Sequence, residues 1–221
     1  MLGNIIQETH NLIGSTEAIN KLKEKDHARI LIISDSHGKT STFIDIVYRY
    51  GKECDALIFC GDGAGDLAAL LNGALCDNEL NTCIPPVIAF VAGNGDPSIY
   101  PVNGDKILSF PDKQTLSVNG TDILIVHGHM QAVDFGLEQL KQEMSDNNCK
   151  IAFYGHTHIA REDNEDGFKI ANPGSCARPR GGQPQCFAIA TVEKKFVDIA
   201  YIKMTLQNDG KTVFQIWNPI F

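Results

Sequence analysis

Positive charge is scarce in this chain of 221 residues, which carries 19 Lys and Arg against 27 Asp and Glu and has a formal net charge of −8. Proteins that bind long nucleic acids without regard to sequence rely on Lys and Arg to contact the phosphates. The acidic balance therefore argues against a broad nucleic-acid surface. An anionic substrate would instead have to meet a local positive centre, such as a metal ion.

Paired cysteines and long apolar runs are also missing. The seven cysteines are an odd number and include no C-x-x-C pair, so we expect reduced thiols, most of them small core residues. The opening stretch MLGNIIQETHNLIG is too polar for a signal peptide, and no apolar run approaches the roughly 18 residues of a membrane span. These absences predict a cytoplasmic protein with no membrane partner.

What is present is an alternation of apolar strands and amphipathic helices. Continuous apolar runs, typical of strands buried on both faces, begin near residues 30, 56, 87, 122 and 151. The strand near 122 follows a predicted Asn119-Gly120 turn. Further elements are predicted as helices at 40–51, 66–75 and 134–144, a hairpin at 159–171, and antiparallel strands at 186–204 and 211–217. The hairpin and the C-terminal strands are predicted to form a second sheet together.

An N-terminal arm precedes the first strand. Residues 1–26 carry apolar residues at helical spacing, and Gly14-Ser15 divides them into two predicted helices, with Ser15 or Thr16 capping the second. The apolar stripe of these helices would be exposed on an isolated arm. We therefore expect a helical extension, residues 1–26, that packs on the body at 27–221 or on a second copy of the chain, giving a homo-oligomer.

Polar side chains follow the apolar runs at intervals of about 30 residues, the length of one strand–helix–strand (βαβ) unit. These side chains are Asp35, Asp62, Asn94, His127 and His156. Open α/β sheets bind ligands beyond the carboxyl ends of their strands. We therefore expect these five side chains, with the neighbouring His37 and His158, to meet at one edge of one sheet.

The residue types in this set indicate a metal centre. Carboxylate, amide and imidazole donors without a thiolate suit Mn²⁺, Fe, Zn²⁺ or Ni²⁺. Seven candidate ligands are too many for one ion with open positions, but they fit two ions bridged by one carboxylate. Five of the seven histidines lie at these strand ends, whereas His10 lies in the N-terminal arm and His27 directly follows it, and both are interpreted as surface residues. Coincidental surface polarity is the alternative interpretation of the whole set.

The motifs DSH, GD, GNGD, HGH and GHTH occur in this order, and NPGSCARPRGG follows at residues 172–182. Over roughly residues 28–203, this pattern resembles the calcineurin-like metallophosphoesterases, and within them the small bacterial and archaeal single-domain phosphodiesterases. The resemblance implies an α/β fold, a four-layer α/β/β/α sandwich of two mixed sheets. It also implies hydrolysis of a small phosphodiester by a metal-bound hydroxide, without a covalent enzyme intermediate.

The resemblance further implies which residue binds which ion. One ion would be bound by Asp35, His37 and His158, and the second by Asn94, His127 and His156. Asp62 would bridge the two. The two histidines of GHTH would therefore serve different ions, and Gly155 would let their loop pass close to both. Two divalent cations are implied, with Mn²⁺ preferred and Fe, Zn²⁺, Ni²⁺ and Mg²⁺ as alternatives.

Other residues near the motifs receive weaker assignments. We predict Asn94 and His129 as catalytic residues. His129 could contact the substrate phosphate or hold a ligand in place, and a plain structural role is the alternative. Arg178 and Arg180 lie in the Gly- and Pro-rich loop after the last motif, where they are predicted to bind phosphate; a solvated loop is the alternative. Two aspartates are interpreted structurally: Asp66 as the N-cap of its helix and Asp96 as a loop cap.

Two rival functions have to be weighed. A non-catalytic scaffold of the same fold, as in the retromer subunit, would have lost ligands, whereas all seven are present here. Phosphoprotein phosphatases carry G-D-x-x-D-R-G, but in GDGAGDL the second aspartate is followed by Leu67. One departure concerns Gly95, because many members of the superfamily have at this position a histidine that is thought to protonate the departing alkoxide.

Overall fold

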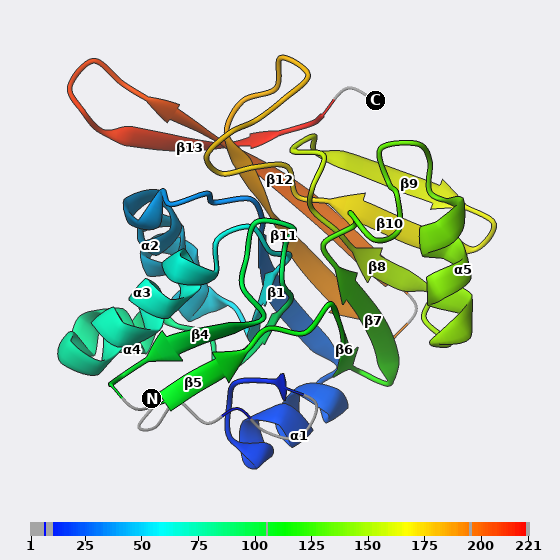
Figure 1. Cartoon of the computed structure of the whole chain (residues 1–221), viewed down its shortest axis with the longest axis horizontal. Helices are drawn as coiled ribbons and strands as arrows, with labels where there is room; N and C mark the ends of the chain where they lie inside the picture. The colour runs from blue at the N-terminus through cyan, green and yellow to red at the C-terminus, as the bar shows by residue number, and fades with distance from the viewer. Residues whose placement is uncertain (1–6, 8–10, 105, 195, 220–221) are drawn as a thin grey trace.

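Two mixed β-sheets form the centre of the protein, and helices cover their outer faces (Figure 1). The computed structural model describes residue 7 and residues 11–104, 106–194 and 196–219. Its helices are α1 Thr16–Glu24, α2 Thr40–Tyr50, α3 Ala64–Cys76, α4 Asn78–Cys83 and α5 Glu138–Asp146, with a short 3₁₀ turn at Gly51–Glu53. Its strands are β1 His27–Ile33, β2 Ala56–Phe59, β3 Val87–Phe90, β4 Ile99–Val102, β5 Lys106–Ser109, β6 Lys113–Val118, β7 Thr121–Val126, β8 Ile151–Phe153, β9 Arg161–Glu165, β10 Phe168–Asn172, β11 Cys186–Glu193, β12 Phe196–Leu206 and β13 Thr212–Trp217.

The six-stranded sheet has the order β13-β12-β11-β1-β2-β3, and the five-stranded sheet has the order β6-β7-β8-β10-β9. In the first sheet β1, β2 and β3 run parallel and β11 joins β1 antiparallel. In the second sheet β7, β8 and β10 run parallel, with β6 and β9 antiparallel at the edges. Both sheets are therefore mixed, as predicted.

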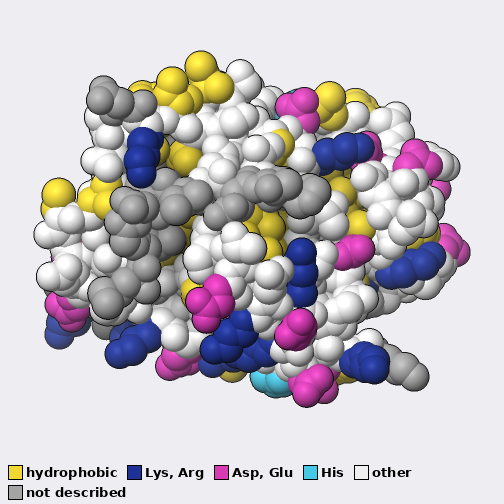
Figure 2. All heavy atoms as spheres, turned by 90° about the horizontal axis from the view of Figure 1, so that it is seen from below, with side chains coloured by type: hydrophobic (Ala, Val, Ile, Leu, Met, Phe, Trp, Pro, Cys, Tyr) yellow, Lys and Arg dark blue, Asp and Glu magenta, His cyan; other side chains and the backbone are white. Residues whose placement is uncertain are grey.

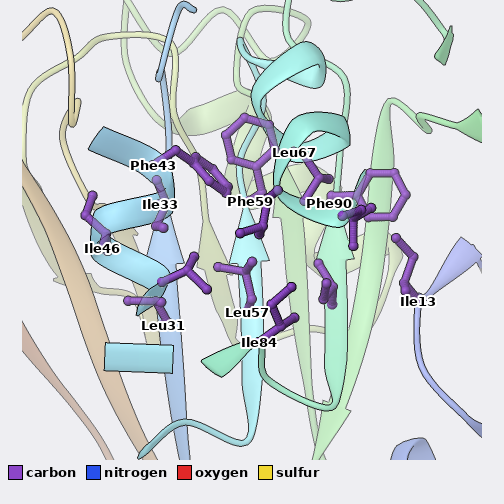
Figure 3. Packing of buried hydrophobic residues seen from close by; sticks show 14 of the residues in the cluster. Ile13, Leu31, Ile33, Phe43, Ile46, Leu57, Phe59, Leu67, Ile84 and Phe90 are labelled. Atoms are coloured by element: carbon purple, nitrogen blue, oxygen red, sulfur yellow. The ribbon is translucent and has the colours of Figure 1, made fainter. Parts of the chain in front are cut away.

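The side chains of β1 point alternately to the two faces of its sheet, and this alternation shows how the layers are built. Leu31 and Ile33 point into a buried cluster under α2 and α3, which Figure 3 shows from close by. Ile30 and Ile32 point the other way, into a cluster that also holds residues of β7 and β8 and so lies between the sheets. A third cluster, which includes Leu140 of α5, covers the outer face of the second sheet. Because side chains alternate across a strand, the three clusters make four layers, and the predicted α/β/β/α sandwich is confirmed.

The predicted assignment of strands to sheets was wrong in two respects. The sequence places the five polar strand ends at one sheet, but β1, β2 and β3 belong to the first sheet and β7 and β8 to the second. The hairpin β9–β10 was grouped with the C-terminal strands, yet it pairs with β8, whereas β11 to β13 extend the β1 sheet.

The helix predicted to begin at Asp134 begins at Glu138. The Asn119-Gly120 turn joins β6 and β7 with positive φ at both residues, as predicted.

The described part of the N-terminal arm, residues 7 and 11–26, lies against the body. Ser15 caps α1 as predicted, its Oγ accepting a hydrogen bond from Ala18 N at 3.1 Å. The first predicted helix lies mostly outside the described residues, and in the described part the prediction was wrong. Ile13 is extended there, exchanging two backbone hydrogen bonds of 2.9 and 2.8 Å with Ile88. This bridge covers the free edge of β3, which removes an unpaired strand edge.

Helix α1 closes the end of the sandwich opposite the strand ends that carry the motifs. Ile19 and Leu22 join the cluster between the two sheets. Figure 2 shows this end of the molecule, with basic and acidic side chains interspersed around apolar ones. Within the described part of the chain, no helix has the length and apolar character needed to cross a membrane.

The arm yields a stability prediction. Leu22→Ala is expected to lower the free energy of unfolding by about 2–5 kcal/mol, because it removes a buried side chain and leaves a cavity between α1 and the sheets. Lys21→Ala is the matched control, since Lys21 is exposed on the same helix. Urea unfolding followed by circular dichroism measures both. Equal midpoints for Leu22→Ala and the control would show that α1 does not contribute to folding of the body.

Candidate metal centre

All seven predicted ligands lie in loops that follow strands. Those after β1, β2 and β3 come from one sheet, and those after β7 and β8 come from the other. The carboxyl ends of the two sets of parallel strands meet at the same end of the sandwich, so the ligands face one another across the gap between the sheets.

The first group consists of Asp35, His37, Asp62 and His158, whose candidate ligand atoms lie within 4.8 Å of one another. Nε2 of His158 is 3.2 Å from Oδ1 of Asp35 and 3.0 Å from Nε2 of His37. Asp35 is fully buried. Its Oδ2 accepts a hydrogen bond from Ser34 Oγ at 2.6 Å, but its Oδ1 has no hydrogen-bond donor among the described residues.

The tautomer of His158 explains why this group calls for a cation. Its Nδ1 lies 2.7 Å from the carbonyl oxygen of Arg178, which can only accept, so Nδ1 carries the proton and Nε2 of the neutral ring presents a lone pair. That lone pair faces Asp35 Oδ1, which also only accepts. A bare carboxylate oxygen and a bare imidazole nitrogen in contact repel each other unless a positive charge lies between them. The residues therefore fit a divalent metal ion.

The pKa values in this group follow the same electrostatics. Burial lowers the pKa of His37, with the carboxylates Asp62 and Asp35 opposing that effect. Burial also works against protonation of His158, but the negative charge of the adjacent Asp35 carboxylate and the contact with the Arg178 carbonyl outweigh the burial and raise the pKa of His158. The buried carboxylates thus attract positive charge to this point.

The second group consists of Asn94, His127 and His156. Oδ1 of Asn94 is 3.2 Å from His127 Nε2 and 2.9 Å from His156 Nδ1. His127 is buried, and its Nδ1 lies 2.7 Å from the carbonyl oxygen of Cys60. This contact holds the proton on Nδ1 and directs the Nε2 lone pair into the group, as ligand histidines require.

Asp62 lies between the two groups. Its Oδ2 is 3.7 Å from Nε2 of His37 in the first group and 3.7 Å from Nε2 of His127 in the second. Its Oδ1 accepts a hydrogen bond from Gly95 N at 2.8 Å, which fixes the carboxylate plane. The described geometry thus gives Asp62 the central position that the predicted bridging role needs, while the assignment of ligands to ions stays a prediction.

The backbone at this end of the sandwich is strained. Asp35, His37, Asp62, His156 and His158 all have φ between 42° and 69°, a region that residues other than glycine adopt rarely. Such conformations cost of the order of 1–3 kcal/mol each and persist at sites where the surroundings force them. Five of the seven predicted ligands therefore have costly backbone conformations, as is common at functional sites.

Glycines let these loops approach one another. A Cβ on Gly155 would lie 2.1 Å from Ser34 Oγ, and a Cβ on Gly93 would lie 2.1 Å from Asp62 Oδ1. Neither contact is physically possible without movement of the loops. The predicted role of Gly155, close passage of the GHTH loop, agrees with this geometry.

Two supporting aspartates differ in how well the sequence predicts them. Asp96 is a loop cap as predicted: its carboxylate accepts hydrogen bonds from the backbone N–H groups of Asp62, Gly63, Ala64 and Gly93 at 2.7–2.9 Å.

The prediction for Asp66 was wrong. It lies inside α3, whose N-cap is Gly63, and its buried carboxylate accepts hydrogen bonds from Ser36 Oγ and Gly38 N at 2.6 and 2.9 Å. It therefore ties the DSH loop to α3.

The predicted substrate contacts border the groups of ligands. The ring of His129 lies 5.4 Å from that of His127, between centroids, and its Nδ1 is buried without a partner among the described residues. Arg178 and Arg180 are exposed, and the backbone of their loop wraps His158: the Arg178 carbonyl accepts from its Nδ1, and Arg180 N donates to its carbonyl at 3.1 Å. Their contacts with substrate stay predictions.

A cavity of about 290 Å³ opens beside the first group. Its lining includes His37, Asp62, Gly95 and Tyr100. Gly95 does not have a positive φ, so its backbone conformation is open to other residues. Larger hollows of about 620 and 600 Å³ lie on other faces, around Lys150 and around α1.

The cysteines do not take part in the site chemistry. All seven lie in the described part of the chain and are free thiols, and only Cys76 among them is exposed. Burial raises the pKa of the Cys60 and Cys176 thiols well above the ordinary range, which suppresses the nucleophilic thiolate. The burial of most of the cysteines, expected for small core residues, is confirmed.

Sequence reasoning missed Asp134. Its Oδ2 lies 2.8 Å from Nε2 of His156, on the far side of that ring from Asn94. Asp134 lies in a turn-rich segment between β7 and α5, which has no periodicity, and it was interpreted as part of a helix. No signal in the sequence separates it from other surface aspartates.

Comparison with known proteins identifies relatives of this chain. Residues 29–195 match the model of the calcineurin-like phosphoesterase superfamily domain. A probable metallophosphoesterase of Bacillus subtilis, YsnB, is 30% identical over 78% of this chain and 89% of its own length. The phosphodiesterase YfcE of Escherichia coli is 28% identical over 85% of this chain and 97% of its own. Vacuolar Protein Sorting 29 of Cryptosporidium parvum shares the fold, with a TM-score of 0.65 and 18% identity, over 87% of this chain and 98% of its own.

Proposed function

Because this chain belongs to the calcineurin-like phosphoesterase superfamily, we propose that it is a phosphodiesterase that works with two divalent metal ions, Mn²⁺ foremost. The observation that carries the proposal is the placement of Asp62, whose Oδ2 is 3.7 Å from a histidine nitrogen of each group. One carboxylate oxygen at the same distance from a histidine nitrogen of each group suits a pair of cations bridged by that carboxylate.

The residues of the chain have defined parts in this proposal. Asp35, His37 and His158 hold one ion, Asn94, His127 and His156 hold the other, and Asp62 contacts both. When bound, such ions lower the pKa of a coordinated water molecule to near neutral and neutralise the charge on phosphoryl oxygens. Water is then the nucleophile, and no Ser or Cys of the chain has to form a covalent intermediate.

Groups beside the ions complete the proposed site. Arg178 and Arg180 place two exposed guanidinium groups on the loop that wraps His158, where they can bind the phosphate as planar hydrogen-bond donors. His129 lies beside His127 and His156. Its proposed parts are contact with the phosphate or support of His127. Asn94, besides its contact with an ion, is proposed to orient the phosphoryl oxygen.

The donor set also separates this proposal from its rivals. A scaffold that has abandoned catalysis has no need to keep seven donors at one end of the sandwich, five of them at strained φ values. Phosphoprotein phosphatases use an arginine next to the GD motif, whereas here Leu67 occupies that part of α3 and is fully buried. A diester carries one fewer negative charge than a monoester and needs less positive charge, which agrees with the few basic side chains beside this site.

A panel of substrates tests the proposal. With Mn²⁺ supplied, hydrolysis of bis(p-nitrophenyl) phosphate is expected to exceed that of p-nitrophenyl phosphate by at least about tenfold in kcat/KM, a difference of about 1.4 kcal/mol in transition-state stabilisation. Chelator-treated protein is the control and is expected to be inactive towards both. Preference for the monoester would reverse the assignment, and inactivity of fully metallated protein towards all esters would favour the scaffold.

A further inference from the structure

We propose that Asp134 is a positioning residue for His156, and that through this histidine it sets the affinity of the second metal position. This inference rests on the proposed function of the site. It adds a residue outside the five motifs, on the loop between β7 and α5. The two nitrogens of His156 face different partners.

The contacts of His156 divide its ring between ligand and support. Nδ1 is 2.9 Å from Asn94 Oδ1, on the side of the second group, and Nε2 is 2.8 Å from Asp134 Oδ2. A carboxylate oxygen accepts, so Nε2 carries the proton of the neutral ring and Nδ1 keeps its lone pair. Asp134 thereby selects the tautomer in which the nitrogen that faces Asn94 and His127 can bind a metal.

The support of His156 differs in charge from that of the other histidines. The far nitrogens of His127 and His158 lie against neutral backbone carbonyls, those of Cys60 and Arg178. His156 instead lies against a carboxylate. A carboxylate partner increases the electron-donating strength of an imidazole ligand and fixes its orientation. Of these three rings, His156 is the one whose ligand strength depends on a side chain that mutation can remove.

The loop that carries Asp134 is anchored to the body on both sides of this residue. Val133 and Leu137 on either side are buried in the cluster under α5. Val133 N donates to the Gly128 carbonyl at 3.3 Å, and Phe135 N donates to the Ala132 carbonyl at 2.9 Å. Ala132 itself has φ of 50°, a conformation that is costly for alanine.

The loop therefore holds Asp134 over His156 by anchors on both sides. The side chains of Asp134 and His156 are 48% and 21% exposed, and exposed pairs of this kind contribute little to stability. Orientation of the ring is thus the main physical consequence of the contact, and removal of the carboxylate should affect metal binding more than folding.

Metal titration of the whole protein tests this inference. Wild type, Asp134→Ala and Asp134→Asn are stripped with chelator and titrated with Mn²⁺ by calorimetry. Asp134→Ala is expected to weaken one of the two binding steps about 10- to 100-fold and to leave the other unchanged. Asp134→Asn keeps an acceptor oxygen without the charge and should give a smaller loss. Asp209→Ala, in the exposed β12–β13 turn, is the matched control and should bind as wild type.

A second readout separates orientation from folding. In metal-free protein at alkaline pH, nitrogen-15 NMR of the histidine rings should show the Nε2–H tautomer of His156 in wild type and a mixture of tautomers in Asp134→Ala. Unchanged binding steps with an unchanged His156 tautomer would overturn the inference, as would equal weakening of both steps. The outcome does not depend on hydrolysis: if the protein bound two ions but cleaved no ester, the proposed function would fail while the Asp134 effect could still be observed.

Discussion

Asp62→Asn is expected to reduce hydrolysis of bis(p-nitrophenyl) phosphate by about 10³-fold at saturating Mn²⁺. The amide keeps the size of the side chain but removes its charge and leaves one oxygen able to bind a cation. Because Oδ2 is 3.7 Å from a histidine nitrogen of each group, both metal positions should lose affinity. Metal ions contribute several kcal/mol of transition-state stabilisation, and each 1.4 kcal/mol is a factor of ten in rate.

The Asp62 experiment needs metal content and folding measured together. Elemental analysis after gel filtration gives the ions bound per chain, and thermal melting reports the fold. Asp45→Asn, on the exposed face of α2, removes the same charge away from the site and should keep both ions and the full rate. If Asp62→Asn retained two ions and wild-type turnover, Asp62 would not be the bridging residue.

Gly95→His is expected to speed cleavage of diesters with poor leaving groups. A general acid typically accelerates such reactions by about 10²–10⁴-fold, and Gly95 has no side chain to donate a proton. It lines the cavity beside His37 and Asp62. A dinucleoside monophosphate, which expels an alkoxide, should gain far more than bis(p-nitrophenyl) phosphate, whose nitrophenolate departs without help.

The structure makes the Gly95 experiment feasible. The backbone at Gly95 lacks a positive φ, so the strain that a side chain would meet in the left-handed region does not arise. An added Cβ would lie 3.2 Å from Asp62 Oδ1, which requires a shift of a few tenths of an ångström. Gly95→Asn adds comparable bulk without an acidic proton and is the matched control. A folded, metal-replete Gly95→His enzyme with the wild-type ratio of rates would place the proton donor elsewhere, with His129 or solvent next.

The gathering of the candidate ligands at strand ends could be predicted from the sequence because these polar residues closely follow apolar runs. Asp35 follows the run that became β1, and His127 follows the run that became β7. Which sheet each strand joins was not predictable, because strands buried on both faces have the same pattern in either sheet. The sequence therefore indicates where each strand ends but not that the ends meet across two sheets.

Side-chain contacts over long sequence separations are also absent from sequence patterns. Asp66 has the residue type and the place of a helix cap, yet it bonds Ser36 and Gly38 from within α3. Asp134 resembles any surface aspartate until the fold brings it to His156. The hairpin β4–β5 was missed. Its large apolar residues Ile99 and Ile107 are exposed, whereas the strand predictions depend on apolar runs typical of strands buried on both faces.

The central claim is that two ions act together at this end of the sandwich, and a titration of rate against bound metal tests it most directly. Metal-free protein is loaded with known amounts of Mn²⁺, and bound ions and hydrolysis of bis(p-nitrophenyl) phosphate are measured on the same samples. The account predicts saturation at two ions per chain, with most of the activity appearing as the second ion binds. Full activity with one ion per chain, or with none, would contradict it.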